Sequence, residues 1–255
     1  MVQTKRITLY GAVDSPFPHR VRLALEEAKA EYDIIWIDLL AKQEWYEKKV
    51  YPNGGRVPLL VYGGPELHPD EAPSTVADKV VESNVILEFL ADIFPEAHLL
   101  PADPVLRAHA RVCALRVDSK LLKPFMGFVF LNAPPEDLHA ELERFQGMLP
   151  PTGYFAGEWS IADASFMPVL VRWVAALETG LGTFTPEALK ESQEAWRSPR
   201  FARLRKYYED NMARPSMTKS FDPEGMNKKL VQRLDRFRKT GMLNSDLRLP
   251  IPQSQ

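Results

Sequence analysis

A serine flanked by prolines stands where a predicted strand gives way to a predicted helix. The apolar run 6–10 predicts a strand that ends at Gly11, and Asp14-Ser15-Pro16-Phe17-Pro18 follows it. Because proline is tolerated in the first helical turn, Ser15 is expected at the helix N-cap. Two interpretations stay open. Ser15 only caps the helix, which the local sequence favours, or its hydroxyl faces a ligand anion at the positive helix end.

Two other dipeptides have residue types that could bind a peptide-like ligand. Val57-Pro58 opens a predicted strand, where proline costs a ladder hydrogen bond. This indicates either an edge strand or a cis peptide bond that exposes the Val57 backbone for pairing with a ligand. Glu82-Ser83 opens a predicted helix, whose free N–H groups and hydroxyl could bind a carboxylate. An ordinary helix start is the simpler interpretation of that second pair.

A fourth motif, Ser160-Ile161-Ala162-Asp163, is interpreted as structural. Serine followed three residues later by an acid is a relative of the capping box, and an apolar stretch comes next. The motif therefore predicts the start of a buried helix rather than a site.

The elements that must position these residues divide into two parts. The first part has the order βαβαββα, with strands at 6–10, 34–37, 57–62 and Glu66-Leu67, and helices at 17–28, 43–50 and 85–93. A polar stretch from His68 to Lys79 is predicted to be a surface insertion. The second part predicts helices only, at 104–131, 135–147, 160–178 and 199–213. We therefore expect an α+β chain with a first domain over 1–98 and an all-helical second domain over 99–255.

Charge and composition exclude several classes of function. The 255 residues carry 32 basic and 34 acidic side chains, so no bulk positive field is available for nucleic acid or an anionic membrane. No apolar run is long enough to span a membrane, and the N-terminus is too polar for a signal peptide. With Cys113 as the single cysteine, an internal disulfide is excluded and a cysteine-based metal site is disfavoured.

The C-terminal region contains a basic amphipathic pattern. Met226, Leu230, Leu234 and Phe237 recur at helical spacing among lysines and arginines. Such a helix can bind a membrane surface, but docking on its own protein is the favoured prediction.

Taken in order, the motifs resemble those of the cytosolic glutathione transferases over residues 5–215. The omega class is the most similar, because Lys42-Gln43-Glu44-Trp45 matches its Lys-x-Glu-Trp segment after strand two. In that class the first helix opens with Cys-Pro-Phe, whereas this chain has Ser15-Pro16-Phe17. Serine at that position is known in fungal omega-like branches.

The resemblance implies a thioredoxin-like first domain that binds glutathione as co-substrate, without a metal. By that resemblance Val57, before a cis Pro58, would pair with the cysteinyl backbone of glutathione. Glu82 and Ser83 would hold the γ-glutamyl end of glutathione. Lys42 would bind a glutathione carboxylate, and Phe17 would line the site beside the sulfur. The family further implies a cytoplasmic homodimer with a hydrophobic co-substrate site between the domains.

Ser15 gives this site a different chemistry from that of the cysteine enzymes. A free thiol has a pKa of about 8.5, and a hydroxyl donor at a helix N-terminus favours its thiolate. Ser15 is therefore predicted to donate a hydrogen bond to the glutathione thiolate, because no base is in obvious reach to make it a nucleophile. Serine cannot form a mixed disulfide, so we expect conjugation of glutathione to small hydrophobic electrophiles. Two alternatives are glutathione-dependent aryl ether cleavage and non-catalytic carriage of aromatic or phenolic compounds.

The co-substrate site is harder to predict. The aromatic stretch 123–130 could form a pocket wall, although core packing is the more frequent fate of such a stripe. Candidate wall residues are Phe125 and Phe128, with Met167 and Val171 from a later helix.

Overall fold

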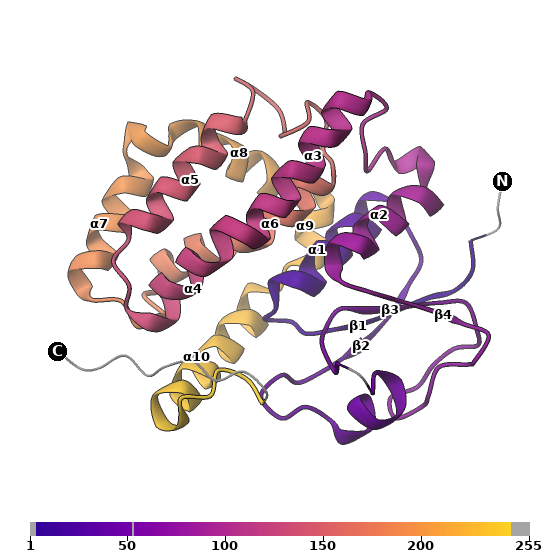
Figure 1. Ribbon diagram of the computed structural model, residues 1–255. Coiled ribbons are helices and arrows are strands. Elements are labelled where there is room, and N and C mark those ends of the chain that lie inside the picture. Colours follow the sequence, from indigo (N-terminus) through magenta and orange to yellow (C-terminus); the bar gives the residue numbers. More distant parts are fainter. Residues whose placement is uncertain (1–3, 53, 246–255) are drawn as a thin grey trace.

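A mixed four-stranded sheet occupies the N-terminal part of the computed structural model, which describes residues 4–52 and 54–245 (Figure 1). Its strands are β1 (Ile7–Gly11), β2 (Asp33–Trp36), β3 (Leu59–Tyr62) and β4 (Asp78–Val81). They lie in the order β2-β1-β3-β4, with β2 parallel to β1 and the other neighbouring pairs antiparallel. This is the thioredoxin-like arrangement that the family resemblance implied.

Alternating side chains of the strands build two cores, one on each face of the sheet. Ile7 and Leu9 of β1 belong to the large core that continues into the helical part. Tyr10, the next residue after Leu9, faces the opposite side and packs against Tyr46 in a smaller core. Because both faces of the sheet are covered, every residue of β1 is buried, which is why the strand was recognisable in the sequence as a short apolar run.

The prediction of a strand at Glu66-Leu67 is wrong. The fourth strand lies further along the chain, where Val81 pairs with Leu59 of β3. Leu67 is instead a buried residue of the connecting loop and belongs to the smaller core under the sheet. Its burial explains an apolar residue that resembled a strand signal.

Two helices and two short helical turns complete the first part. They are α1 (Pro16–Glu27), the π-helical turn η1 (Tyr46–Val50), α2 (Ser83–Ile93) and the 3-10 turn η2 (Pro95–Ala97). The large core joins α1 and α2 to one face of the sheet, and the smaller core joins η1 to the other. The helix expected over 43–50 is thus a short turn rather than a regular helix.

The second part is helical, as predicted. It comprises α3 (Pro104–Arg116), η3 (Val117–Leu121), α4 (Leu122–Leu131), α5 (Glu136–Met148), α6 (Ile161–Thr179), α7 (Pro186–Arg197), η4 (Pro199–Phe201), α8 (Ala202–Met212), α9 (Pro215–Ser220) and α10 (Pro223–Thr240). The helix expected over 104–131 is interrupted at η3 by one π-helical turn. No described helix is both long and apolar enough to cross a bilayer.

Helix α7 was missed by the sequence analysis. Only Ser192 is fully buried in it, but Ala188, Leu189, Ala195 and Trp196 recur at helical spacing and pack partly buried against the large core, so a periodic signal was available. Its start is set by Thr185, whose hydroxyl accepts a hydrogen bond from the Ala188 N–H.

Helix α6 forms the centre of the molecule. Its capping box is present, since the Asp163 carboxylate accepts from the Ser160 N–H at 2.9 Å and the Ser160 hydroxyl accepts from Ala162. Every residue from Ile161 to Leu177 is buried. The helix packs against α1 of the sheet part and against α3, so it joins the two halves of the chain.

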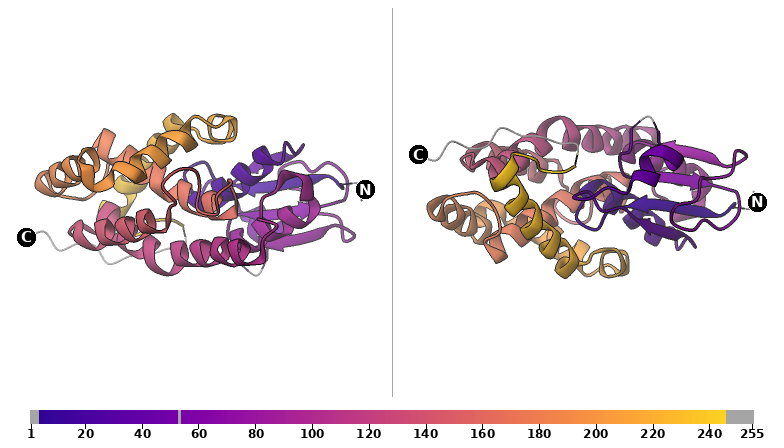
Figure 2. Two further views of the ribbon diagram at one scale, coloured as in Figure 1. Left: turned by 90° about the horizontal axis from the view of Figure 1, so that it is seen from above. Right: turned by 90° about the horizontal axis from the view of Figure 1, so that it is seen from below.

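Helix α10 crosses the outside of the molecule (Figure 2) and lies against the loop before α1 and the segment after β2. Met226, Leu234 and Phe237 bury its apolar stripe against the protein. The predicted docking of this basic amphipathic helix on its own chain is confirmed.

Candidate functional site

A cavity of about 550 Å³ is lined by both parts of the chain and by α10. Most of the predicted site residues line it together, namely Ser15, Phe17, Lys42, Val57, Pro58, Glu82, Ser83 and Phe125. The surface insertion predicted from His68 to Lys79 contributes none of the lining residues, and its last two residues, Asp78 and Lys79, belong to β4 instead. The extra residues before β4 therefore do not form a wall of this cavity.

Three predicted co-substrate residues lie elsewhere. Phe128, Met167 and Val171 are buried in the large core and do not line the cavity. Phe128 stacks on Phe184 with ring centroids 4.8 Å apart. Their apolar character serves packing, which the sequence pattern alone could not separate from pocket lining.

Ser15 occupies the N-cap position of α1 without capping it. Its backbone is extended, with φ −83° and ψ 133°, and its side chain makes no capping hydrogen bond. The residue is 7% exposed, and its hydroxyl has no hydrogen-bond partner among the residues that the structure describes. The capping role that the local sequence favoured is therefore not fulfilled, and the hydroxyl is available to a molecule in the cavity.

The two prolines limit the donors at the start of α1. Pro16 and Pro18 have no N–H, so Phe17 keeps the only backbone N–H among the first three residues of the helix. Phe17 also lines the cavity. The Ser15 hydroxyl and the Phe17 N–H are thus the neutral donors that the first turn offers to an anion.

The Val57-Pro58 bond is cis, and both residues line the cavity directly before β3. The preceding loop is held by a residue of the smaller core, because the Tyr46 hydroxyl donates a hydrogen bond to the Arg56 carbonyl oxygen at 2.6 Å. The backbone directly before β3 therefore forms part of the cavity wall.

Ser83 begins α2 at the same cavity, preceded by Glu82 with a positive φ of 65°. The buried Arg20 of α1 donates to the Ser83 hydroxyl at 3.2 Å and forms an ion pair with Asp118 at 2.7 Å. Asp118 belongs to η3, and it also accepts from the Asn84 side chain. This network ties the start of α2 to the helical part.

Lys42 lies in the segment that follows β2. Its ammonium forms an ion pair with Glu47 at 3.1 Å, and the residue contributes to the cavity wall. A cation at this place can attract a ligand carboxylate.

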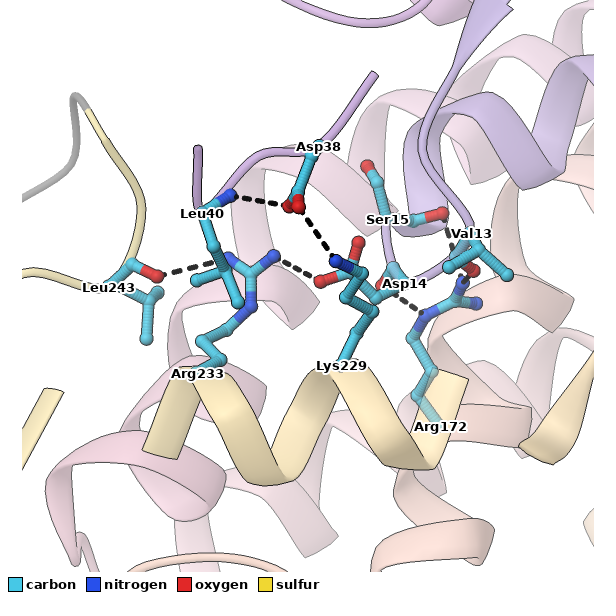
Figure 3. Close-up of polar contacts among 9 residues, drawn as sticks. All are labelled: Val13, Asp14, Ser15, Asp38, Leu40, Arg172, Lys229, Arg233 and Leu243. Carbon is cyan, nitrogen blue, oxygen red and sulfur yellow. Dashed lines mark hydrogen bonds and ion pairs between the residues drawn. The ribbon is translucent and has the colours of Figure 1, made fainter. Parts of the chain in front are cut away.

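The sequence analysis missed Arg172, a buried residue of α6 that lines the cavity beneath Ser15 (Figure 3). Its guanidinium donates to the backbone carbonyl oxygens of Asp14 at 3.0 Å and Ser15 at 2.9 Å. A signal was available, because Arg172 is the only charged residue in the otherwise apolar stretch 166–177.

The basic side chains of α10 were noticed in the sequence but not connected with the site. Arg233 forms a buried ion pair with Asp14, and Lys229 pairs with Asp38 at 2.8 Å (Figure 3). Arg236 donates to the Leu40 carbonyl oxygen at 2.6 Å. Helix α10 is thereby fastened to the loop that carries Ser15 and to the segment after β2.

His19, one turn after Ser15, lies in the interface between α1 and the helical part. Its Nδ1 is 3.2 Å from Arg172 and its Nε2 is 3.2 Å from the Ser220 hydroxyl. Burial and the positive charges of Arg172 and Arg22 hold the pKa of His19 well below its usual value. The imidazole is neutral and fully engaged, so it is not placed as a base for Ser15.

Cys113 is buried in the large core on α3 and does not line the cavity. Burial, with the nearby Asp163 carboxylate, raises the pKa of its thiol well above the usual value. A buried, protonated thiol cannot replace a cysteine at position 15. Among the described residues no cluster of His, Cys, Asp and Glu is placed to hold a metal ion, and the metal-free site stays a prediction.

The fold and the cavity define a thioredoxin-like domain joined to a helical domain, and known proteins share this arrangement. Residues 5–92 match the model of the glutathione S-transferase N-terminal domain. Glutathione transferase Omega 2S from Trametes versicolor is 42% identical, with a TM-score of 0.82, over 90% of this chain and 96% of that one. Omega 1C from the same fungus is 39% identical, with a TM-score of 0.85, over 95% and 100% of the two chains.

The chain belongs to the glutathione transferase family, and its similarity to the two fungal proteins places it in the omega class. Omega 2S has also been solved in complex with 2,4-dihydroxybenzophenone. Among curated relatives, glutathione S-transferase U6 from Arabidopsis thaliana is 30% identical over 58% of this chain and 60% of its own length. The chain spans between 49% and 60% of the length of three curated relatives that it matches.

Proposed function

We propose that the protein is a glutathione transferase in which the Ser15 hydroxyl activates the thiol of glutathione for attack on small hydrophobic electrophiles. Glutathione serves as co-substrate, and no metal takes part. The observation that carries the proposal is the position of Ser15. Its uncapped hydroxyl lines the same cavity as the cis Val57-Pro58 bond and the start of α2.

The lining residues complement the groups of glutathione. Glu82 and Ser83 at the start of α2 suit the amine and carboxylate of the γ-glutamyl end. The Val57 backbone suits the cysteinyl peptide group, and Lys42 suits the second carboxylate. With the tripeptide held in this way its sulfur lies near Ser15 and Phe17.

The reaction needs thiolate, and the site favours that form. A hydroxyl donor and the N-terminus of α1 stabilise negative charge on sulfur. The thiolate then attacks the electrophilic carbon, a C–S bond forms, and the leaving group departs with the bonding electron pair. With an aryl ether as substrate the same attack would release an alkoxide or phenolate, and product analysis separates the two reactions.

Replacement of Ser15 by alanine tests its role directly. Hydrogen bonds to charged groups contribute about 1.5–3 kcal/mol, so Ser15→Ala should lower kcat/KM for conjugation by about 10–100-fold. The affinity for glutathione, measured by calorimetry, should change little because other residues hold the peptide. An unchanged conjugation rate in a folded variant would exclude the proposed role.

Replacement of Ser15 by cysteine tests where the side chain points. The new thiolate should attack oxidised glutathione, form one protein–glutathione disulfide and release one glutathione thiolate. Mass spectrometry should detect the adduct, and thioltransferase activity should appear with it. Because Cys113 is buried, the wild-type protein is the matched control and should stay unmodified. No adduct on the variant means that residue 15 does not face the glutathione sulfur.

Carriage of aromatic or phenolic compounds is the second candidate function. It is supported by the size of the cavity, about 550 Å³, and by the dihydroxybenzophenone complex of the fungal Omega 2S protein. If the protein is mainly a carrier, 2,4-dihydroxybenzophenone should bind tightly while turnover with electrophiles stays negligible. Calorimetry and turnover measured on one preparation distinguish the two functions.

A pair of phenylalanines on α4 tests the site of that binding. Phe125 lines the cavity, whereas Phe128 is a core residue stacked on Phe184. Phe125→Leu should weaken 2,4-dihydroxybenzophenone several-fold, whereas Phe128→Leu should leave its affinity unchanged and lower thermal stability. Equal loss of affinity in both variants would contradict binding beside Phe125.

The proposal includes a cytoplasmic homodimer. An apolar strip supports the dimer, because Val105, Val112 and Leu115 of α3 are each more than half exposed, at 60%, 56% and 65%. Val85 of α2 is 55% exposed. The two helices are joined by an ion pair between Glu88 and Arg111 at 2.7 Å, so the strip spans both of them. A second copy of the chain would cover these side chains.

A further inference from the structure

The guanidinium of Arg172 has no free N–H group. Its Nε donates to the Asp14 carbonyl oxygen, and one Nη donates to the carbonyl oxygens of Ser15 and Val13, at 2.9 and 3.5 Å. The other Nη contacts Nδ1 of His19 at 3.2 Å and the Pro168 carbonyl oxygen at 2.8 Å. An arginine has five N–H donors, so every donor has an acceptor. Although it lines the cavity, this side chain has no donor left for a substrate.

Three of the five acceptors are consecutive carbonyl oxygens of the loop before α1. The loop residues Val13, Asp14 and Ser15 converge on the guanidinium from one side (Figure 3). The planar, rigid fork of arginine fixes these carbonyls in one arrangement. The backbone of Ser15 is thereby held, which fixes its Cβ and limits its hydroxyl to the few rotamer positions around that atom.

The neighbouring histidine completes this arrangement. Arginine has no acceptor, so Nδ1 of His19 must accept, and the ring hydrogen lies on Nε2 and donates to the Ser220 hydroxyl. The ring also stacks on Phe221, with centroids 5.6 Å apart. Helices α1, α6 and α9 therefore support the guanidinium together.

The acceptors of Arg172 are all neutral. Among the described residues no carboxylate lies within ion-pair distance of it, and the nearest acid, Asp14, is paired with Arg233. Burial and the charges of Arg233 and Arg22 lower the pKa of Arg172 to about 9, which Asp14 opposes, so the group stays charged at neutral pH. Because Asp14 is paired with Arg233, the positive charge of Arg172 beside Ser15 is not matched by a carboxylate of its own.

We propose that Arg172 is the positioning residue of this site: it fixes the loop that carries Ser15 and keeps an unpaired positive charge beside the glutathione sulfur. This inference rests on the proposed function. Arg172 acts through the loop and through its field, and it does not touch the substrate.

Two substitutions of Arg172 distinguish the effect of its positive charge from the effect of its hydrogen bonds to the loop. Arg172→Met removes both, so the pKa of the bound glutathione thiol should rise by about one unit, the scale expected for loss of a nearby opposite charge. At pH values below that pKa, kcat/KM should fall about tenfold. Arg172→Lys keeps the charge but has three donors for five acceptors. In the lysine variant the thiol pKa should stay near the wild-type value, while KM for glutathione should rise several-fold.

The experiment titrates the ultraviolet absorbance of the thiolate in the enzyme–glutathione complex and measures kcat and KM over the same pH range. Arg203→Met is the matched control, because Arg203 of α8 also donates to backbone carbonyls, those of Pro150 and Gly153, at 2.7 and 2.6 Å. Arg203 does not line the cavity, so this variant should lose stability without a shift in the thiol pKa.

Every outcome bears on the inference. A folded Arg172→Met variant with wild-type thiol pKa and kcat/KM would overturn it. If that variant does not fold, Arg172→Lys decides, because an unchanged KM would show that the five-acceptor arrangement is not needed. A wild-type protein that binds no glutathione contradicts the proposed function, whereas a lowered thiol pKa that Arg172 does not influence contradicts only this inference.

Discussion

At the scale of single residues, burial changes the pKa of a histidine outside the site, His139. His139 of α5 has its Nε2 3.1 Å from the Ser192 hydroxyl and packs edge-on against Trp173. Burial and the nearby Arg200 charge lower the pKa of its imidazole to about 4. The folded protein therefore keeps His139 neutral at pH values where the unfolded chain already protonates it.

This difference predicts acid sensitivity. Between pH 6.5 and about 4 the unfolded state binds more protons at this residue, so its contribution to stability is complete above pH 6.5 and is lost as the pH falls. His139→Gln should flatten the fall of Tm with pH over this range. His68→Gln, at an exposed loop position, is the control and should leave the slope unchanged. Identical slopes for wild-type and His139→Gln would refute the assignment.

At the scale of elements, α10 joins the two halves of the site. The Arg233–Asp14 pair is the most buried of its ion pairs, with side chains only 9% and 8% exposed. Met226, Leu230 and Arg233 of this helix line the cavity. The helix is therefore a wall of the site as well as a support for the Ser15 loop.

The buried ion pair predicts an asymmetric response to mutation. Arg233→Met leaves the Asp14 carboxylate buried without its partner, which should lower the free energy of unfolding by about 3–5 kcal/mol. Arg238→Met on the same helix breaks the exposed pair with Asp235 and should cost less than about 1 kcal/mol. Urea unfolding measures both, and adding Asp14→Asn to Arg233→Met should recover part of the loss. Equal effects of the two single variants would mean that the buried pair is not stabilising.

At the scale of the whole molecule, the exposed strip on α2 and α3 predicts self-association. The double variant Val112→Glu/Leu115→Glu places like charges in the proposed dimer interface and should convert the dimer to a single chain. Val231→Glu on α10 is the control, because that side chain is also apolar and 42% exposed but lies on another helix. Light scattering after gel filtration measures the mass. A wild-type mass of one chain would contradict the dimer.

Local pattern determined most of the fold. The strands β1 to β3, the helices α1 and α2, and the capping box at Ser160 and Asp163 were predictable, because their signals are periodicity and capping within a few residues. The failures came where burial, not local pattern, decides. Leu67 resembled a strand residue but fills the smaller core, and the apolar residues of α7 are only partly buried.

The same division holds for the site. Sequence motifs and the family resemblance were enough to name Ser15, Val57-Pro58 and Glu82-Ser83, since each stands at the start of a helix or of a strand. Phe128, Met167 and Val171 could not be told from Phe125, because core and pocket walls use the same apolar residues.

By itself, the sequence determined the order of strands and helices in the first part, the helical character of the second part and the serine at position 15. Only the tertiary structure decided that the Ser15 hydroxyl does not cap its helix and that Arg172 and Arg233 surround its loop. The physical reason is the distance along the sequence over which each kind of interaction acts. Strand and helix signals act between residues near in sequence, whereas Arg172 meets Ser15 across 157 positions and Arg233 meets Asp14 across 219.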